Sequence, residues 1–326
     1  MTVNAVLGNL PEEQTGVASL NEYVRLGLPG WDLAPECDYD ESAAFRQIKE
    51  RLLAFKQAGG ALIVDNSGIA MGRRADFLET LSRVSGVHIV STTGFPDELG
   101  TPGHFYPERR FGSDPEVERN HLASLFVNEL TLGMVTDGMV RTKIKAGLIR
   151  TGYVQFPLAL MEDLCHRAAA RASKKTGVAI YSWGNRTNIA ALEFLLAEGA
   201  DPSRIVIGHC DDGLALDSQR DTKIAQAGAY VAYDCVGWED TSIRADSISD
   251  DERAALVVKL IQAGLKERVL LSSGSVGWRL DHEPTAPHGY DHLLTSFVPL
   301  LRARGVSEAD LKTILEDNPR RVLSVQ

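Results

Sequence analysis

The feature that most constrains this chain is an alternation of short apolar segments with longer amphipathic ones, which continues almost from end to end. The short segments are rich in β-branched residues and mostly read as continuous apolar runs, which is typical of parallel strands covered by helices. We predict eight such strands, at Gly16–Leu20, Ala61–Asp65, Val87–Thr92, Ile144–Arg150, Val178–Trp183, Ile205–His209, Tyr230–Asp234 and Val269–Ser273.

Helical patterns fill the intervals between these strands, and several end at a glycine, such as Gly86 or Gly177, just before the next strand. Strict β-then-α alternation calls for parallel strands joined by crossover helices, and eight repeats favour closure into a (β/α)8 barrel. A doubly wound open sheet is the alternative, but it favours a G-x-G-x-x-G turn after the first strand, which this sequence lacks. Helices are predicted at Glu41–Gln57, Arg74–Val84, Pro115–Leu132, Leu158–Lys175, Asn188–Ala197, Ser218–Ala227, Asp251–Ala263, Asp291–Arg304 and Glu308–Glu316.

Length and charge narrow the class of protein. The 326 residues suit one barrel, so we expect a single domain over residues 1–326. A net charge of −10 argues against binding to nucleic acid or to anionic membranes. No apolar run approaches the roughly 20 residues that span a bilayer, the N-terminus lacks the pattern of a secretory signal, and the four cysteines show no paired spacing. We expect a reduced, cytoplasmic protein.

Three stretches carry a resemblance to a known family. They are Val6-Leu7-Gly8 through Glu22, Ile207-Gly208-His209 followed by Asp211-Asp212, and His288-Gly289-Tyr290 to Asn318-Pro319-Arg320-Arg321. Together they make the chain resemble, over nearly its whole length, the phosphotriesterase-like family of the amidohydrolase superfamily, which includes phosphotriesterases and lactonases. The resemblance implies a barrel with an N-terminal hairpin extension, a small-molecule substrate and a homodimer.

The resemblance also implies two divalent metals, held by a His-x-His after the first strand, a carboxylated lysine on the fourth strand, histidines on the fifth and sixth, and an aspartate on the eighth. The corresponding positions in this chain are Asn21 and Tyr23, Arg150, Trp183, His209 and Gly274, so only His209 matches a ligand. A zinc site needs about three or four protein ligands, and an arginine cannot form the bridging carbamate. We therefore expect no bound metal and no other cofactor.

Arg150 is the first candidate for chemistry without metals. A fixed guanidinium in a dry barrel mouth can bind a substrate carboxylate or stabilise a developing oxyanion. The alternative is a salt bridge to a carboxylate at a strand end, such as Asp65, Glu22 or Asp234, because a buried arginine needs a partner.

Five further residues are candidates for catalysis. His209, released from metal ligation, is a candidate general acid or base, or an inherited polar residue of the mouth. Tyr23 is either a donor to an oxyanion or an aromatic plug. Cys235 is a candidate nucleophile activated by His209, although free cysteines are more often buried and inert. Asp65 and Asp234 are candidate bases if burial raises their pKa, or else they brace Arg150.

The substrate pocket is expected to be apolar or aromatic. All four tryptophans fall at predicted strand ends or in the connections that follow, which favours an aromatic pocket over separate packing of loops only by a small margin. The residues expected to contact substrate are Asn21, Trp183, Tyr181, Trp238, Trp278 and Ser273.

Three functions compete on these grounds. The first is a metal-independent hydrolase or lyase that acts on an apolar or aromatic small molecule with a carbonyl, ester or carboxylate group. The second is a catalytically silent, small-molecule-binding barrel. The third is a conventional metal-dependent lactonase or phosphotriesterase, which the absence of any His-x-His disfavours. The residue types that replace the ligands suit recognition and charge stabilisation, so we favour the first.

Overall fold

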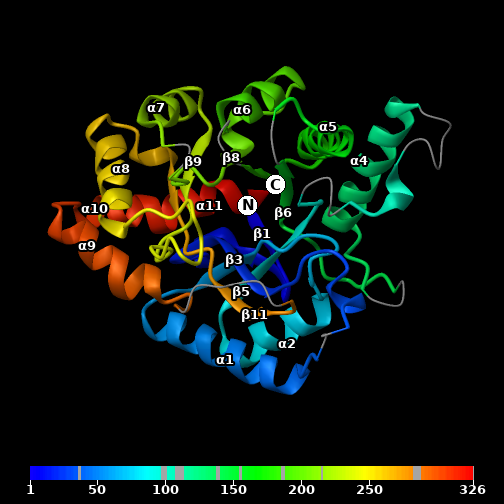
Figure 1. Cartoon of the computed structure of the whole chain (residues 1–326), viewed down its shortest axis with the longest axis horizontal. Coiled ribbons are helices and arrows are strands. Elements are labelled where there is room, and N and C mark those ends of the chain that lie inside the picture. Colours follow the sequence, from blue (N-terminus) through cyan, green and yellow to red (C-terminus); the bar gives the residue numbers. More distant parts are fainter. Residues whose placement is uncertain are drawn as a thin grey trace.

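The computed structural model describes residues 1–35, 38–96, 101–106, 114–136, 140–153, 156–184, 188–213, 216–281 and 288–325. A curved parallel sheet lies at its centre, with strand order β10-β9-β8-β7-β6-β5-β4-β3-β11, and helices surround the sheet (Figure 1). The strands are β3 (Ala18–Leu26), β4 (Leu62–Asp65), β5 (His88–Thr93), β6 (Leu148–Tyr153), β7 (Ile180–Gly184), β8 (Ile205–Ile207), β9 (Tyr230–Tyr233), β10 (Val269–Leu271) and β11 (Val276–Arg279). The predicted (β/α)8 barrel is confirmed.

The surrounding helices fall close to their predicted ranges. They are α1 (Glu41–Gln57), α2 (Ala75–Ser85), α4 (Pro115–Thr131), α5 (Leu160–Thr176), α6 (Asn188–Ala197), α7 (Ser218–Gln226), α8 (Asp250–Gln262), α9 (Val298–Ala303), α10 (Glu308–Lys312) and α11 (Asn318–Leu323). Two π-helical segments precede α9 and α11, at Leu293–Phe297 and Thr313–Asp317. Gly86 and Gly177 cap α2 and α5 in the left-handed conformation, as their positions predicted. Within the described residues, no helix has both the length and the apolar character required to cross a bilayer.

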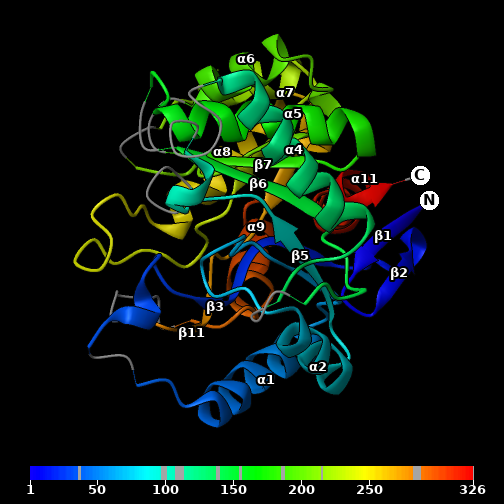
Figure 2. The ribbon, with the colours of Figure 1, turned by 90° about the vertical axis from the view of Figure 1, so that its right-hand side faces the viewer.

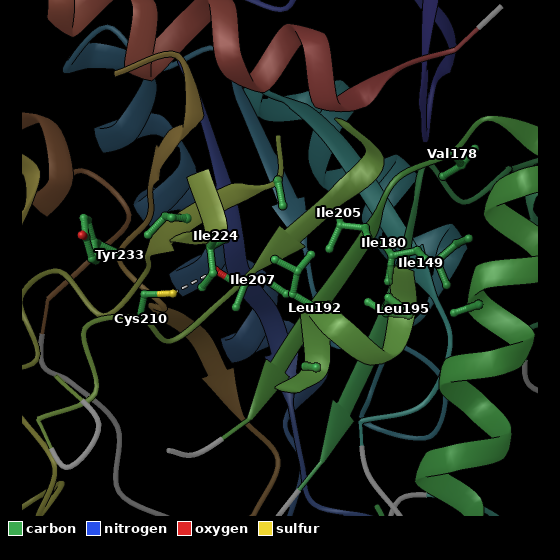
Figure 3. Packing of buried hydrophobic residues seen from close by; sticks show 14 of the residues in the cluster. Ile149, Val178, Ile180, Leu192, Leu195, Ile205, Ile207, Cys210, Ile224 and Tyr233 are labelled. Carbon is green, nitrogen blue, oxygen red and sulfur yellow. Dashed lines mark hydrogen bonds between the residues drawn. The ribbon is translucent and has the colours of Figure 1, made fainter. Parts of the chain in front are cut away.

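Alternation along each strand builds two hydrophobic layers. Leu148 of β6 points into the barrel with residues such as Val64, while its neighbour Ile149 points outward to the helices. Figure 3 shows this outer layer, where Ile180 and Ile207 pack against α6 and α7. The same period of two carries the side chains at the C-terminal ends of the strands alternately into the barrel mouth and away from it.

The predicted hairpin closes the end of the barrel opposite the C-terminal ends of the strands. Strands β1 (Thr2–Ala5) and β2 (Gly8–Pro11) pair antiparallel, and β12 (Ser324–Val325) extends this small sheet. Figure 2 shows the hairpin and both chain ends together on one side of the barrel. Val3, Leu10 and Val322 join the interior hydrophobic cluster. The hairpin and α11 therefore seal this end, and the opposite end is left for the site.

The seam of the barrel lies between β3 and β10, which share no strand ladder among the described residues. The predicted eighth strand, Val269–Ser273, corresponds to β10, which ends at Leu271, and β11 follows after residues 272–275 as a strand that the sequence analysis did not predict. The Ser272 hydroxyl accepts hydrogen bonds from the backbone N–H groups of Leu20 and Asn21, at 2.9 and 3.0 Å. Beyond it, the Gly274 N–H donates to the Asn21 carbonyl at 3.1 Å.

Glu22 reinforces this seam from β3. Its buried carboxyl accepts hydrogen bonds from the hydroxyls of Ser19 and Ser273, at 2.6 and 2.7 Å, and from the N–H groups of Ser273 and Ser275, at 2.9 and 2.7 Å. Burial raises the pKa of Glu22 to about 7, although these hydrogen bonds act in the opposite direction.

The main correction to the predicted elements concerns β3. The sequence predicted a strand that ends at Leu20, but β3 continues to Leu26 and carries an irregularity between Ser19 and Glu22. Polar residues at positions 21 and 22 suggested a loop, yet the hydrogen bonds at the seam satisfy them inside the strand. Likewise β6 begins at Leu148 and continues past Arg150 to Tyr153.

Glu22 should give the protein a characteristic dependence of stability on pH. Between pH 4.5 and about 7 the folded protein retains a proton on Glu22 that the unfolded chain has lost. The free energy of unfolding contributed by this group therefore falls as pH rises through that window, by about 3 kcal/mol. Urea denaturation of wild type and Glu22→Gln at pH 4.5 and pH 8 should show the variant gaining by that amount relative to wild type. A difference that does not change with pH would contradict the assignment.

Candidate active site

A cavity of about 210 Å³ lies at the C-terminal ends of the strands. Strands from both sides of the seam contribute to it, together with the connections that follow β4 and β9. Its lining residues are Asn21, Tyr23, Leu26, Leu28, Met71, Arg150, Trp183, His209, Asp234, Cys235, Trp238, Arg244, Gly274, Val276 and Arg279. The structure thus brings together most of the residues that the sequence singled out.

His209 and Asp234 form a hydrogen-bonded pair in this cavity. His209 Nδ1 lies 2.8 Å from Asp234 Oδ1, and the backbone N–H of His209 donates to the same oxygen at 2.9 Å. With Nδ1 as the donor, Nε2 carries the free lone pair, and no described residue bonds to it. The backbone of His209 has a φ of 53°, a left-handed conformation that is uncommon for a residue other than glycine. Such strain persists where surrounding contacts over-determine it.

Gly208 allows the close packing beneath this pair. A Cβ atom at position 208 would lie 2.6 Å from the Tyr181 ring and 2.9 Å from Asp234 Oδ2, closer than a real Cβ can approach. The Ile207-Gly208-His209 stretch therefore places the histidine and admits the aspartate in one short turn after β8.

Asp234 accepts several hydrogen bonds besides those of His209. Tyr181 donates its hydroxyl to Oδ2, and Asn21 Nδ2 donates to the same oxygen at 3.2 Å. Burial alone would raise the pKa of Asp234, but the charge and hydrogen bonds of His209, with the Tyr181 hydroxyl, outweigh it and hold that pKa below its usual range. Asp234 is therefore an ionised acceptor that orients the imidazole.

Arg150 lies in the same cavity with 1% of its surface exposed. Its Nη1 donates to the backbone carbonyls of Asn66 and Ser67. Its guanidinium carbon lies 5.1 Å from the centre of the Trp183 ring and 5.7 Å from that of Tyr23. The salt bridge expected as an alternative role is absent: no carboxylate in the described part of the chain lies within 4.0 Å of this guanidinium.

Trp183 and Tyr23 occupy positions where the resembled family places histidines. The Trp183 ring lies 5.0 Å from the His209 ring, so the indole borders both His209 and Arg150. Burial raises the pKa of the Tyr23 hydroxyl, so at neutral pH it is a hydrogen-bond donor. No described residue accepts from this hydroxyl, and the ring forms part of an apolar wall with Leu26, Met71 and Val276.

Cys235 lies beside the pair but in an environment that suppresses its reactivity. Its thiol is 3% exposed, and burial raises its pKa well above the usual value. Arg244 Nη1 approaches Sγ at 2.8 Å, while the other nitrogens of this guanidinium bond to Asp246. At neutral pH this thiol is protonated.

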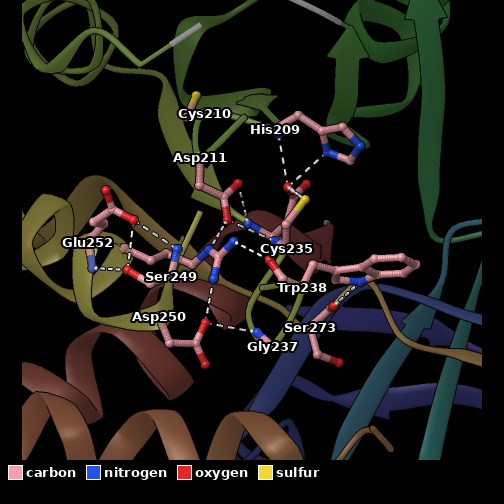
Figure 4. A network of polar contacts seen from close by, with 12 residues as sticks. His209, Cys210, Asp211, Cys235, Gly237, Trp238, Ser249, Asp250, Glu252 and Ser273 are labelled. Carbon is pink, nitrogen blue, oxygen red and sulfur yellow. Dashed lines mark hydrogen bonds and ion pairs between the residues drawn. The ribbon is translucent and has the colours of Figure 1, made fainter. Parts of the chain in front are cut away.

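A second polar network supports the site from behind, as Figure 4 shows. Asp211 accepts hydrogen bonds from the backbone N–H groups of Asp234 and Cys235, at 3.2 and 3.0 Å. It also pairs with the buried Arg253 at 2.6 Å. Trp238 donates its indole N–H to the Ser273 carbonyl at 3.1 Å, which ties the connection after β9 to the seam.

Four predicted site residues lie outside the cavity lining. Asp65 follows the outward parity of β4 and accepts hydrogen bonds from the Val24 N–H and the Ser67 hydroxyl. Ser273 braces Glu22, and Tyr181 lies below the cavity and reaches it only through Asp234. Trp278 packs against the hydrophobic cluster that includes residues of α1 and α2, although its neighbours Val276 and Arg279 on β11 line the cavity.

Sequence reasoning missed two kinds of lining residue. Leu26, Met71 and Val276 provide apolar wall, but they look like ordinary core residues in the sequence. Arg244 and Arg279 bring further positive charge and are held by Asp246 and Asp281. A lone arginine within the acidic stretch after Trp238 was the available signal for Arg244.

The described residues contain one group of three potential metal ligands, His209, Asp234 and Cys235, whose donor atoms lie within 4.8 Å of one another. Arg244 faces the sulfur of this group, and the hydrogen bonds described above already engage the carboxylate.

Comparison with known proteins agrees with this architecture. The family model described as "Phosphotriesterase family" matches residues 1–323. The Phosphotriesterase homology protein of Escherichia coli (strain K12) is 30% identical over 313 residues, covering 94% of this chain and 97% of the relative. The N-acetyltaurine hydrolase of Homo sapiens is 30% identical over 285 residues, covering 85% and 77%. A structure of the organophosphorus hydrolase from Deinococcus radiodurans superposes with a TM-score of 0.89 at 28% identity, covering 99% and 97%. This chain therefore belongs to the phosphotriesterase family.

Proposed function

We propose that this protein is a hydrolase that cleaves an ester or amide bond of a small molecule without a binuclear metal centre. The observation that carries the proposal is the His209–Asp234 pair, in which Asp234 fixes the imidazole and leaves Nε2 free at the cavity. The names of the relatives, which include an N-acetyltaurine hydrolase, support hydrolysis of a small acyl compound.

The residues present do not fit a pair of divalent ions. Asn21, Tyr23 and Trp183 replace three expected histidine ligands, and Arg150 places a fixed cation where the bridging carbamate would form. The remaining group of His209, Asp234 and Cys235 has its own guanidinium, that of Arg244, at 2.8 Å from the sulfur. Three protein ligands are too few to hold two ions, and the guanidinium groups of Arg150 and Arg244 beside them would repel divalent cations.

The chemistry follows from the pair and its neighbours. His209 Nε2 takes a proton from water as the water oxygen bonds to the acyl carbon, and the carbonyl electron pair moves onto its oxygen. The Tyr23 hydroxyl donates a hydrogen bond to that oxygen. The imidazolium then gives its proton to the departing nitrogen or oxygen as the acyl bond breaks. Asp234 stays ionised and stabilises the imidazolium, as in other carboxylate–histidine pairs.

A silent, small-molecule-binding barrel is the second candidate. The observation that favours it is the aromatic lining of the small cavity, to which Trp183, Tyr23 and Trp238 contribute. This second function predicts that the protein binds a small molecule and does not turn it over.

The first prediction from this proposal concerns the need for metal and the role of His209. We expect turnover of short acyl amides, aryl esters or lactones to persist in excess chelator, and His209→Asn to lower kcat by ~10²- to 10⁴-fold because it removes the base. His88→Asn, at the opposite end of the barrel, is the control and should leave kcat unchanged. Elemental analysis of the purified protein accompanies the assay. Stoichiometric metal with chelator-sensitive turnover would contradict the proposal.

The second prediction concerns Asp234. Asp234→Asn removes the negative charge and presents an amide donor to groups that themselves donate, so the imidazole loses its fixed orientation. We expect kcat to fall by ~10²- to 10⁴-fold with little change in KM. Combined with His209→Asn, it should cost little more than either change alone, because the two residues act as a unit. Additive losses in the double variant would show that they act separately. Nitrogen NMR of the His209 ring reports the tautomer directly.

A further inference from the structure

Arg150 differs from other buried arginines of this protein in how its charge is balanced. Arg253 pairs with Asp211 and Asp250, and Arg220 pairs with Asp221. Arg150 is as deeply buried, yet within the described residues its hydrogen-bond partners are two backbone carbonyls, those of Asn66 and Ser67. A buried cation that lacks a counter-ion costs several kcal/mol, so an anion brought to it is bound strongly.

One edge of the guanidinium, which includes a buried Nε, has no hydrogen-bond partner among the described residues. Both carbonyl contacts fall on Nη1, whereas Nε has no hydrogen-bond partner and no described residue accepts from Nη2. Nε and Nη2 form the side of the guanidinium that presents two parallel N–H groups, the geometry that binds a carboxylate through both oxygens. The rings of Tyr23 and Trp183 flank the group and fix its plane.

Trp183 relates the position of Arg150 to that of the base. The indole ring lies 5.1 Å from the guanidinium carbon and 5.0 Å from the His209 ring, so the cation and the base border the same ring. A group bound by Arg150 is therefore a short spacer away from a carbonyl that His209 attacks through water. The apolar wall of Leu26, Met71 and Val276 remains for an acyl chain.

We propose that Arg150 is a binding residue for a single negative charge on the substrate, and that the substrate is an acyl compound with a carboxylate or sulfonate a short spacer away from the scissile carbonyl. The substrate class rests on the hydrolase function proposed above. The anion site itself does not, because binding at Arg150 requires no turnover.

Binding of simple probes tests the site on the full-length protein. Butanoate, butanesulfonate and neutral butanamide share a chain length, and their affinities are measured by calorimetry in excess chelator at low and high salt. We expect wild type to bind the two anions at least ten times more tightly than butanamide, with a preference that weakens as salt increases. The ratio of butanoate to butanesulfonate distinguishes a planar from a tetrahedral head group.

Variants assign the preference to Arg150. Arg150→Met should abolish the preference for anions, and Arg150→Lys should keep part of it, because the charge remains but the two-pronged donor is lost. Arg268→Met is the matched control, since Arg268 lies 5.1 Å over the Tyr230 ring away from the cavity, and it should bind as wild type does. If Arg150→Met fails to fold, Arg150→Lys and the salt dependence of wild type still decide the matter. Equal binding of butanoate and butanamide by wild type, or unchanged binding by either Arg150 variant, would overturn the proposal.

His209→Asn separates this inference from the hydrolase function. We expect this variant to bind butanoate with wild-type affinity while turnover is lost. Anion binding by a wild-type protein that turns over no acyl amide, ester or lactone would leave the subsite standing and remove the hydrolase. Turnover of neutral esters that is slowed by Arg150→Met through kcat alone, with no preference for anions, would instead make Arg150 an oxyanion donor and refute the subsite.

Discussion

The mouth of this barrel is organised around a positive charge that no carboxylate of the described residues neutralises. Two aromatic faces and two backbone carbonyls stabilise the Arg150 guanidinium, and a cation–π contact contributes about 0.5–2 kcal/mol. Those contacts fall short of the cost of burying an unpaired ion, which is several kcal/mol. This imbalance is the physical basis of the proposal that Arg150 binds an anionic group of the substrate.

The second constraint is the placement of His209 by its neighbours. Asp234 receives hydrogen bonds from the imidazole and from the backbone of His209, and its other oxygen receives those of Tyr181 and Asn21. Asp211 in turn fixes the backbone that follows β9. The left-handed backbone of His209 is affordable because so many contacts determine it. The position at which the resemblance implies a metal ligand is here one end of a hydrogen-bonded pair.

The sequence predicted the barrel well because hydrophobic alternation is local, and apolar strands separated by amphipathic helices allow few architectures. It also identified Arg150, His209 and Asp234, since each follows the inward parity of its strand or the turn that ends it. Asp65 was predicted at the barrel mouth, but its side chain lies on the outer face of the sheet and that of Asn66 on the inner face. Successive side chains of a strand alternate between the two faces, so an error of one residue exchanges them. The seam was beyond reach, since it depends on hydrogen bonds between segments far apart in the sequence, whereas Arg244 offered only the signal of a lone arginine in an acidic stretch.

The seam between β3 and β10 has a consequence for motion. Elsewhere in the sheet each strand is held to its neighbour by a ladder of backbone hydrogen bonds. At the seam, two backbone N–H groups instead donate to the Ser272 hydroxyl, and the Glu22 carboxyl accepts the hydrogen bonds that complete the closure. Segments held by fewer ladder bonds open at lower free energy than the global unfolding of a domain. Asn21 and Gly274, which lie along this joint, also line the cavity. We therefore expect local opening of the barrel to be concentrated at this joint, where it would widen the cavity and act on the hydrogen bond from Asn21 to Asp234.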